Sequence, residues 1–190
     1  MADLTLTPAP LLGGYQRSFG ATDLREATDL AIVSLAVPQG DEARCATALD
    51  TAYGCAMPDS GRYVVSNDGQ TRVIRTAPDQ LFVLFPHAAP NARAVVATAT
   101  GDAFWSTDQT DNWCALELSG PQARAALARI CMLNLHPQAF GPDHAARTVM
   151  EHMGAMILRS GDDAFLLLSA RSSAKSFLHA VETSVTNVSD

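Results

Sequence analysis

Apolar positions along residues 29–106 switch between strand-like and helix-like spacing. A continuous apolar run at 30–37 predicts a buried strand. Residues 41–56 predict a helix, because their apolar side chains recur along one face at three- and four-residue intervals. The elements expected after this helix are strands at 62–66, 71–76 and 81–86, a short helix at 90–99, and a strand at 103–106. Up to this closing strand, the first half therefore predicts the order β-α-β-β-β-α.

Residues 107–190 repeat that order without repeating the residues themselves. Their expected elements are a strand at 113–118, a helix at 121–131, strands at 146–150, 154–160 and 164–169, and a final helix at 172–185. Helices that interrupt runs of antiparallel strands indicate the α+β class. We therefore predict two interlocked β-α-β-β-β-α half-units with antiparallel sheets, 29–106 and 107–190, which together form one compact unit.

Residues 1–28 show neither strand-like nor helix-like spacing of apolar residues, and they are rich in Pro, Gly and Thr. We expect an extended N-terminal arm with apolar anchors, which becomes ordered only against another surface. The anchors are Leu11, Leu12, Tyr15 and Phe19.

The charge of the chain narrows the classes of partner. A net charge of −7 argues against a nucleic-acid role, and no apolar run is long enough to cross a membrane. We expect a cytoplasmic protein without a membrane anchor. With 47% hydrophobic and only 17% charged residues, the surface is short of charge, as a surface covered by a partner would be. The basic residues comprise twelve arginines and one lysine, which fits either interface use or a GC-rich genome.

Motifs of known chemistry are missing from the sequence. There is no GxGxxG, no phosphate-binding GxxxxGK[ST] loop and no GxSxG nucleophile turn. The four cysteines form no CxxC pair, and Cys45, Cys114 and Cys131 lie in apolar patterns, as reduced core thiols do.

The stretch 133–154 nevertheless gathers three of the five histidines, His136, His144 and His152. Residues eight apart diverge by about 80° around a helix, so these side chains do not share a helical face. Neither HExxH nor a Cys/His quartet with zinc spacing occurs. We therefore expect no catalytic, cofactor-binding or metal-ligating residue in this chain.

Four pieces of the second half point to a family. They are WCALELSGPQAR at 113–124, LNLHPQAF at 133–140, ART at 146–148, and DAFLLLSARSSAKSF at 163–177. In content and order they resemble the gamma subunit of heterotetrameric sarcosine oxidase. The resemblance is weaker over 30–106 and absent from the arm. Asn134 departs from the family's usual Asp, and Ser173 from its common aromatic residue.

The resemblance implies a fold and a function. The family resembles the folate-binding region of aminomethyltransferases, which suits a doubled α+β unit. The complex oxidatively demethylates sarcosine to glycine with FAD, FMN, NAD, zinc and tetrahydrofolate, all on other subunits. This chain would then be a non-catalytic structural subunit, and its partners would be the alpha, beta and delta subunits.

Within that interpretation the loop at 133–154 is a scaffold, and Phe140, His144 and Arg147 are candidate partner contacts. A purely internal role for them remains open.

Two other functions remain open as well. One is the small subunit of a related N-methyl amino acid dehydrogenase, such as one acting on N-methylglutamate or dimethylglycine. The other is a free folate-binding one-carbon protein, whose pocket needs a buried carboxylate beside aromatic rings. Asp111, near Trp105 and Trp113, is the only candidate for that carboxylate.

Overall fold

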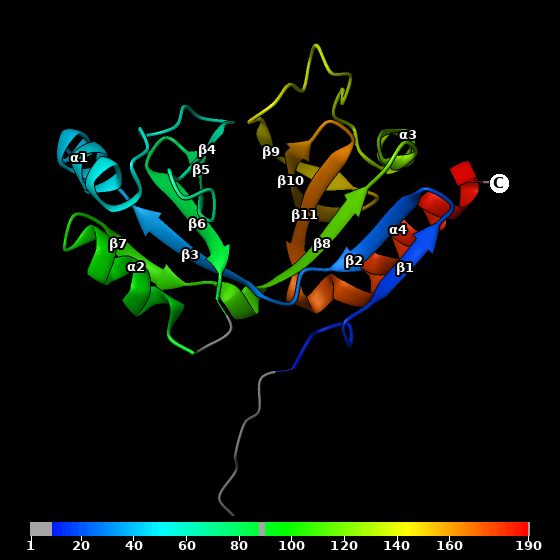
Figure 1. Cartoon of the computed structure of the whole chain (residues 1–190), viewed down its shortest axis with the longest axis horizontal. Helices are drawn as coiled ribbons and strands as arrows, with labels where there is room; N and C mark the ends of the chain where they lie inside the picture. Colours follow the sequence, from blue (N-terminus) through cyan, green and yellow to red (C-terminus); the bar gives the residue numbers. More distant parts are fainter. Residues whose placement is uncertain (1–8, 88–89, 190) are drawn as a thin grey trace, which may run out of the picture.

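The chain folds into two antiparallel sheets that face each other, in a computed structural model that describes residues 9–87 and 90–189 (Figure 1). The five-stranded sheet has the order β4-β5-β6-β3-β7, and the six-stranded sheet the order β1-β2-β8-β11-β10-β9. Helices α1 and α2 cover the outer face of the first sheet, and α3 and α4 that of the second. The α+β class with antiparallel sheets is therefore confirmed.

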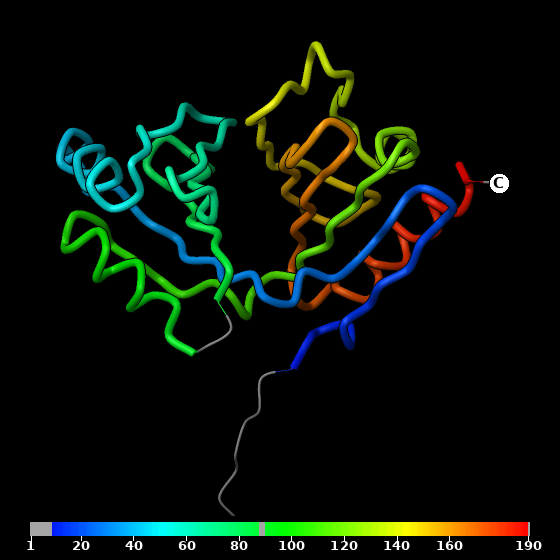
Figure 2. The backbone as a smooth tube through the Cα atoms, viewed as in Figure 1, coloured from blue at the N-terminus to red at the C-terminus, as the bar shows by residue number. Residues whose placement is uncertain are grey.

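The five-stranded sheet and its helices comprise β3 (Leu30–Ala36), α1 (Glu42–Tyr53), β4 (Tyr63–Val65), β5 (Arg72–Ala77), β6 (Gln80–Pro86), α2 (Ala92–Thr100) and β7 (Trp105–Asp108). The six-stranded sheet and its helices comprise β1 (Gln16–Phe19), β2 (Thr22–Glu26), β8 (Trp113–Ser119), α3 (Ala123–Ile130), β9 (Ala145–Met150), β10 (Met153–Gly161), β11 (Ala164–Ala170) and α4 (Ala174–Ser189). The chain crosses between the sheets through 27–29 and again through the short 3-10 helix Thr110–Asn112 (Figure 2). In the described residues, no helix is long and apolar enough to span a bilayer.

The central strands are apolar on both faces because helices cover one face of each sheet and the other sheet covers the opposite face. Strand β6 buries five residues in a row. Leu81, Val83 and Phe85 pack under α1 and α2, whereas Phe82 and Leu84 point toward the other sheet. A continuous hydrophobic run is the pattern expected of a strand in that position.

The N-terminal segment differs from the predicted arm. Residues 16–26 form the hairpin β1–β2, and β2 pairs with β8, with Leu24 opposite Leu118. The strand is hard to see in the sequence because the buried positions of TDLRE are Thr22, Leu24 and Glu26, of which only one is apolar.

The four predicted anchors, Leu11, Leu12, Tyr15 and Phe19, pack on the core of their own chain. The Glu26 carboxylate helps to hold this segment, accepting hydrogen bonds from the backbone N–H groups of Leu12 and Gly14 at 2.9 and 2.8 Å. Residues 1–8 of the predicted arm lie outside the described residues. The division into 1–28, 29–106 and 107–190 stays a prediction. The hairpin, which comes from the first of these segments, belongs to the sheet of the second half.

Tyr15 and Arg17 fasten the same segment to α4. The Tyr15 hydroxyl and the Arg17 guanidinium both donate to Glu182, at 2.9 and 2.6 Å. The Tyr15 hydrogen bond, followed by Arg17, lowers the pKa of the Glu182 carboxyl. Burial, followed by the bond to Glu182, raises the pKa of Tyr15 to about 12.

Gly120 allows the hairpin to approach the end of β8. Its φ is +121°, and a Cβ built there would lie 2.6 Å from the Thr22 Cα and closer still to the Ala21 carbonyl oxygen. Only glycine tolerates both the dihedral and the contact.

We therefore expect Gly120→Ala to lower the free energy of unfolding by about 3 kcal/mol, through clash and backbone strain. Gly154→Ala is the matched control, because a Cβ there meets nothing within 4 Å. It should change stability by less than about 1 kcal/mol. Urea denaturation of the full-length chain measures both, and equal effects would contradict this account of the hairpin.

The Glu182 contacts predict a pH dependence. A lowered folded pKa contributes stability above the unfolded pKa of the carboxyl, and this stability is lost as the pH falls through the folded value. Glu182→Gln should therefore cost up to about 1 kcal/mol at pH 7, since the carboxylate is partly exposed. The difference from wild type should shrink as the pH falls below 4.5, the ordinary value of the group. Denaturation curves measured from pH 7 to pH 3 test this, and a constant difference across that range would refute it.

Candidate functional site

Two arginines hold the segment from Leu135 to His144 in place. Buried Arg159 on β10 donates to the carbonyl oxygens of Phe140 at 3.2 Å and Gly161 at 3.0 Å. Arg124 on α3 donates to the Leu135 carbonyl and, at 2.5 Å, to that of Asp162. Both guanidiniums thus tie this loop to the β10–β11 turn, and the loop is a scaffold fixed on its own chain.

The turn at its start is built from short-range bonds. The Asn134 side-chain oxygen accepts from the backbone N–H of His136 at 3.0 Å, a bond that an Asp would also make. The His136 carbonyl then accepts from the N–H groups of Ala139 and Phe140, both at 2.8 Å. The departure from the family at 134 therefore removes a charge but no hydrogen bond.

Two of the three predicted partner contacts also make contacts within their own chain. Phe140 is only 5% exposed and belongs to the core under α3 and α4. The half-buried ring of His144 lies 5.3 Å from the Phe140 ring, and its Nδ1 lies 2.9 Å from Nη1 of Arg62. Through Arg62 and His144 the edge of the first sheet meets the edge of the second. Within their own chain these two residues therefore position the loop and join the halves, and their contact with a partner stays a prediction.

Arg147, the third predicted contact, is exposed. It projects from β9 on the face that carries Ala145, and its guanidinium lies 6.0 Å above the Phe82 ring of the other sheet. Across residues 9–87 and 90–189, no carboxylate forms an ion pair with it.

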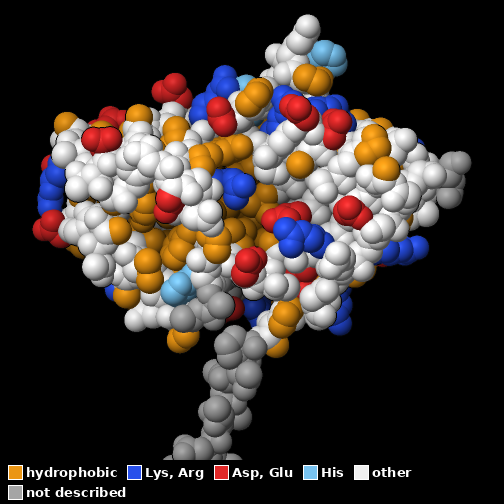
Figure 3. Space-filling view, viewed as in Figure 1, with side chains coloured by type: hydrophobic (Ala, Val, Ile, Leu, Met, Phe, Trp, Pro, Cys, Tyr) orange, Lys and Arg blue, Asp and Glu red, His pale blue; other side chains and the backbone are white. Residues whose placement is uncertain are grey.

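Hydrophobic side chains gather in a hollow between the two halves (Figure 3). Strand register places Val65 and Val149 on the two faces that turn toward each other, 42% and 37% exposed. Trp105, opposite Ala36, lies on the same face of its sheet and is 75% exposed. We call Val65, Trp105, Arg147 and Val149 the inner face. Three of these four residues are apolar, and only Arg147 was singled out from the sequence. Strand register also places Arg72 and the Arg25–Glu117 ion pair on the two inward faces.

The described residues contain no group of three or more His, Cys, Asp or Glu that could hold a metal ion. The four cysteines are buried thiols, and burial raises the pKa of Cys114 to about 12, so that thiol stays protonated at neutral pH. The Asp111 carboxylate is fully exposed and pairs with Arg171 at 3.3 Å. It is therefore not the buried carboxylate that the folate alternative needs.

Comparison with known proteins identifies a family that this chain matches over most of its length. The model of the "Sarcosine oxidase, gamma subunit family" matches residues 39–186. A sarcosine oxidase subunit gamma from Arthrobacter sp. is 30% identical over 149 residues, which cover 78% of this chain and 72% of that protein.

Two solved structures share the fold. One is a heterotetrameric sarcosine oxidase from Corynebacterium sp. U-96, with a TM-score of 0.77 at 24% identity, covering 92% of this chain and 88% of that one. The other is a glycine cleavage system aminomethyltransferase from Bartonella henselae, with a TM-score of 0.61 at 17% identity, covering 85% and 45%.

The division between inward-facing and exposed residues predicts different effects on stability. Phe140→Ala should lower the free energy of unfolding by about 3–5 kcal/mol, since it empties a core position. Arg147→Ala should change it by less than about 0.5 kcal/mol, since the side chain is exposed and unpaired. Thermal and urea unfolding of the full-length chain compare the two, and a large loss for Arg147→Ala would give that residue an internal role instead.

Proposed function

This chain belongs to the sarcosine oxidase gamma-subunit family, and we propose that it is the non-catalytic structural subunit of a cytoplasmic, heterotetrameric sarcosine oxidase. In that complex the partner subunits, alpha, beta and delta, oxidatively demethylate sarcosine to glycine. We assign FAD, FMN, NAD, zinc and tetrahydrofolate to those partners. The observation that carries the structural role is the inner face, an exposed apolar hollow around a guanidinium without an ion pair in the described residues.

The inner face has the composition of a binding surface. Interface cores are enriched in aromatic residues and Arg and depleted of Lys and carboxylates. Trp105, Arg147 and the two valines follow that composition. The guanidinium lies 6.0 Å over the Phe82 ring, at the outer limit of a cation–π contact, and stays exposed toward a partner carboxylate.

Phe140 and His144 have a positioning role in this proposal. Phe140 fills the core, and His144 carries the bond to Arg62 at the junction of the sheets. The backbone N–H of Arg159 on β10 donates to the His144 carbonyl at 3.0 Å, just before β9 begins. These contacts fix the strand from which Arg147 projects.

We expect Arg147→Ala to weaken association with the partner subunits by about 10- to 100-fold, the loss of a desolvated charge contact. The tagged chain is purified from its host, and the co-purifying chains, the flavin absorbance and sarcosine turnover are measured. Arg171→Ala is the matched control, because it also removes an exposed Arg but lies outside the inner face. Undiminished association of Arg147→Ala, or an equal loss in the control, would contradict the docking role.

A further inference from the structure

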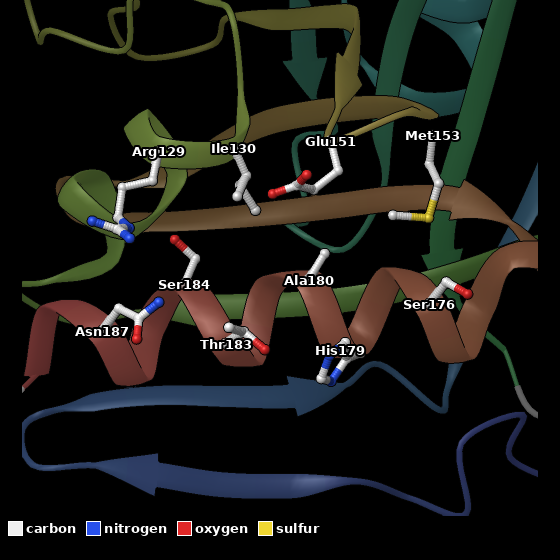
Figure 4. Close-up of a pocket in the computed structure, with 10 residues that line it drawn as sticks. All are labelled: Arg129, Ile130, Glu151, Met153, Ser176, His179, Ala180, Thr183, Ser184 and Asn187. Atoms are coloured by element: carbon white, nitrogen blue, oxygen red, sulfur yellow. The ribbon is translucent and has the colours of Figure 1, made fainter.

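A second hollow lies on the outer side of the six-stranded sheet, between the end of α3, the β9–β10 turn and α4 (Figure 4). Its volume is about 360 Å³, within the range of small-ligand pockets. Ile130, Met153 and Ala180 give it an apolar floor, and polar side chains surround them. We call this hollow the α3–α4 groove.

Two opposite charges face into the groove without meeting. Arg129 extends from the last turn of α3 toward Asn187 on α4, and the Glu151 carboxylate reaches over Ile130 from the β9–β10 turn (Figure 4). Their charged atoms are farther apart than the 4.0 Å of an ion pair. Neither side chain donates or accepts a hydrogen bond within the described part of the chain.

The backbone fixes this arrangement. The N–H of Glu151 donates to the carbonyl of Ile130 at 2.9 Å, so the acid is anchored to the neighbour of Arg129 in the sequence. The adjoining bridge between Cys131 and Met150 supports the same contact. Glu151 adopts a φ of +52°, which is uncommon for a residue other than glycine and sets the direction of its side chain.

We propose that the α3–α4 groove binds a small zwitterionic α-amino acid, whose carboxylate meets Arg129 and whose ammonium group meets Glu151. A guanidinium binds a carboxylate through two parallel hydrogen bonds. Asn187 lies at the same end of the groove as Arg129, and its side-chain amide can donate a third hydrogen bond to the ligand's carboxylate. A simple anion would be repelled by Glu151 and a simple cation by Arg129. A ligand with both charges is attracted by both residues, and a small side chain fits over the apolar floor.

The site is open to solvent, and this exposure limits its affinity for the ligand. Exposed charge pairs are weak and screened by salt. We therefore expect a dissociation constant of about 1 mM at low salt, and weaker binding as the salt concentration rises. This site lies on the opposite face of the six-stranded sheet from the inner face, so it goes beyond the proposed subunit role.

Calorimetric titration of the full-length chain with glycine tests the proposal, with acetate and methylammonium as single-charge probes. Glycine should bind at one site and both single-charge probes at least about 10-fold more weakly. Arg129→Gln and Glu151→Gln should each weaken glycine binding by about 10-fold, whereas Arg171→Gln, outside the groove, should not. The same comparison on the assembled complex, wild type against Arg129→Gln, should show one glycine site weakened by about 10-fold in the variant.

Three results would overturn the proposal. They are the absence of saturable glycine binding, acetate binding as tight as that of glycine, and unchanged binding in both groove variants. Unfolding curves of the variants show that they are folded, and co-purification shows that they still assemble. A failure here therefore leaves the proposed subunit role intact.

Discussion

The contact between the two sheets governs the rest of this structure. Each sheet has helices on its outer face, so its other apolar face must be buried against something. Phe82 and Leu84 of one sheet meet Met156 and Leu158 of the other in a shared cluster. The Tyr63 hydroxyl adds a 2.6 Å hydrogen bond to the carbonyl of Arg159 across the same boundary. Because the sheets splay apart from this contact, part of each inner surface remains uncovered, and the hollow in Figure 3 results.

The loop at 133–154 contributes to that geometry. Its polar groups are used for local support, through Asn134, Arg159 and Arg124. The support ends at β9, which presents Arg147 to the hollow. The same strand then turns through Glu151 toward the α3–α4 groove on the other side of its sheet. A short segment thus connects two surfaces of different chemistry, one apolar and suited to a protein partner, the other charged and suited to a small zwitterion.

Strands and helices that bury a regular apolar pattern could be predicted from the sequence. β6 and α4 are examples, since their periodicity reflects direct burial. The hairpin β1–β2 could not, because Thr22 and Glu26 are buried through hydrogen bonds and not through hydrophobicity. The exposed Arg147 and the buried Phe140 could not be told apart either. Their exposure depends on contacts with α3, α4 and β6, which are distant in sequence. Local spacing of apolar residues does not predict such contacts.

In the proposed complex, partner subunits cover the inner face. Hydrogen–deuterium exchange of the chain alone and in the assembled oxidase measures this directly, strand by strand. We expect slower exchange in β4, β7 and β9 on assembly, with α1 unchanged, because a covering partner excludes water from the inner face. Protection confined to the outer helices, with those three strands unchanged, would contradict it.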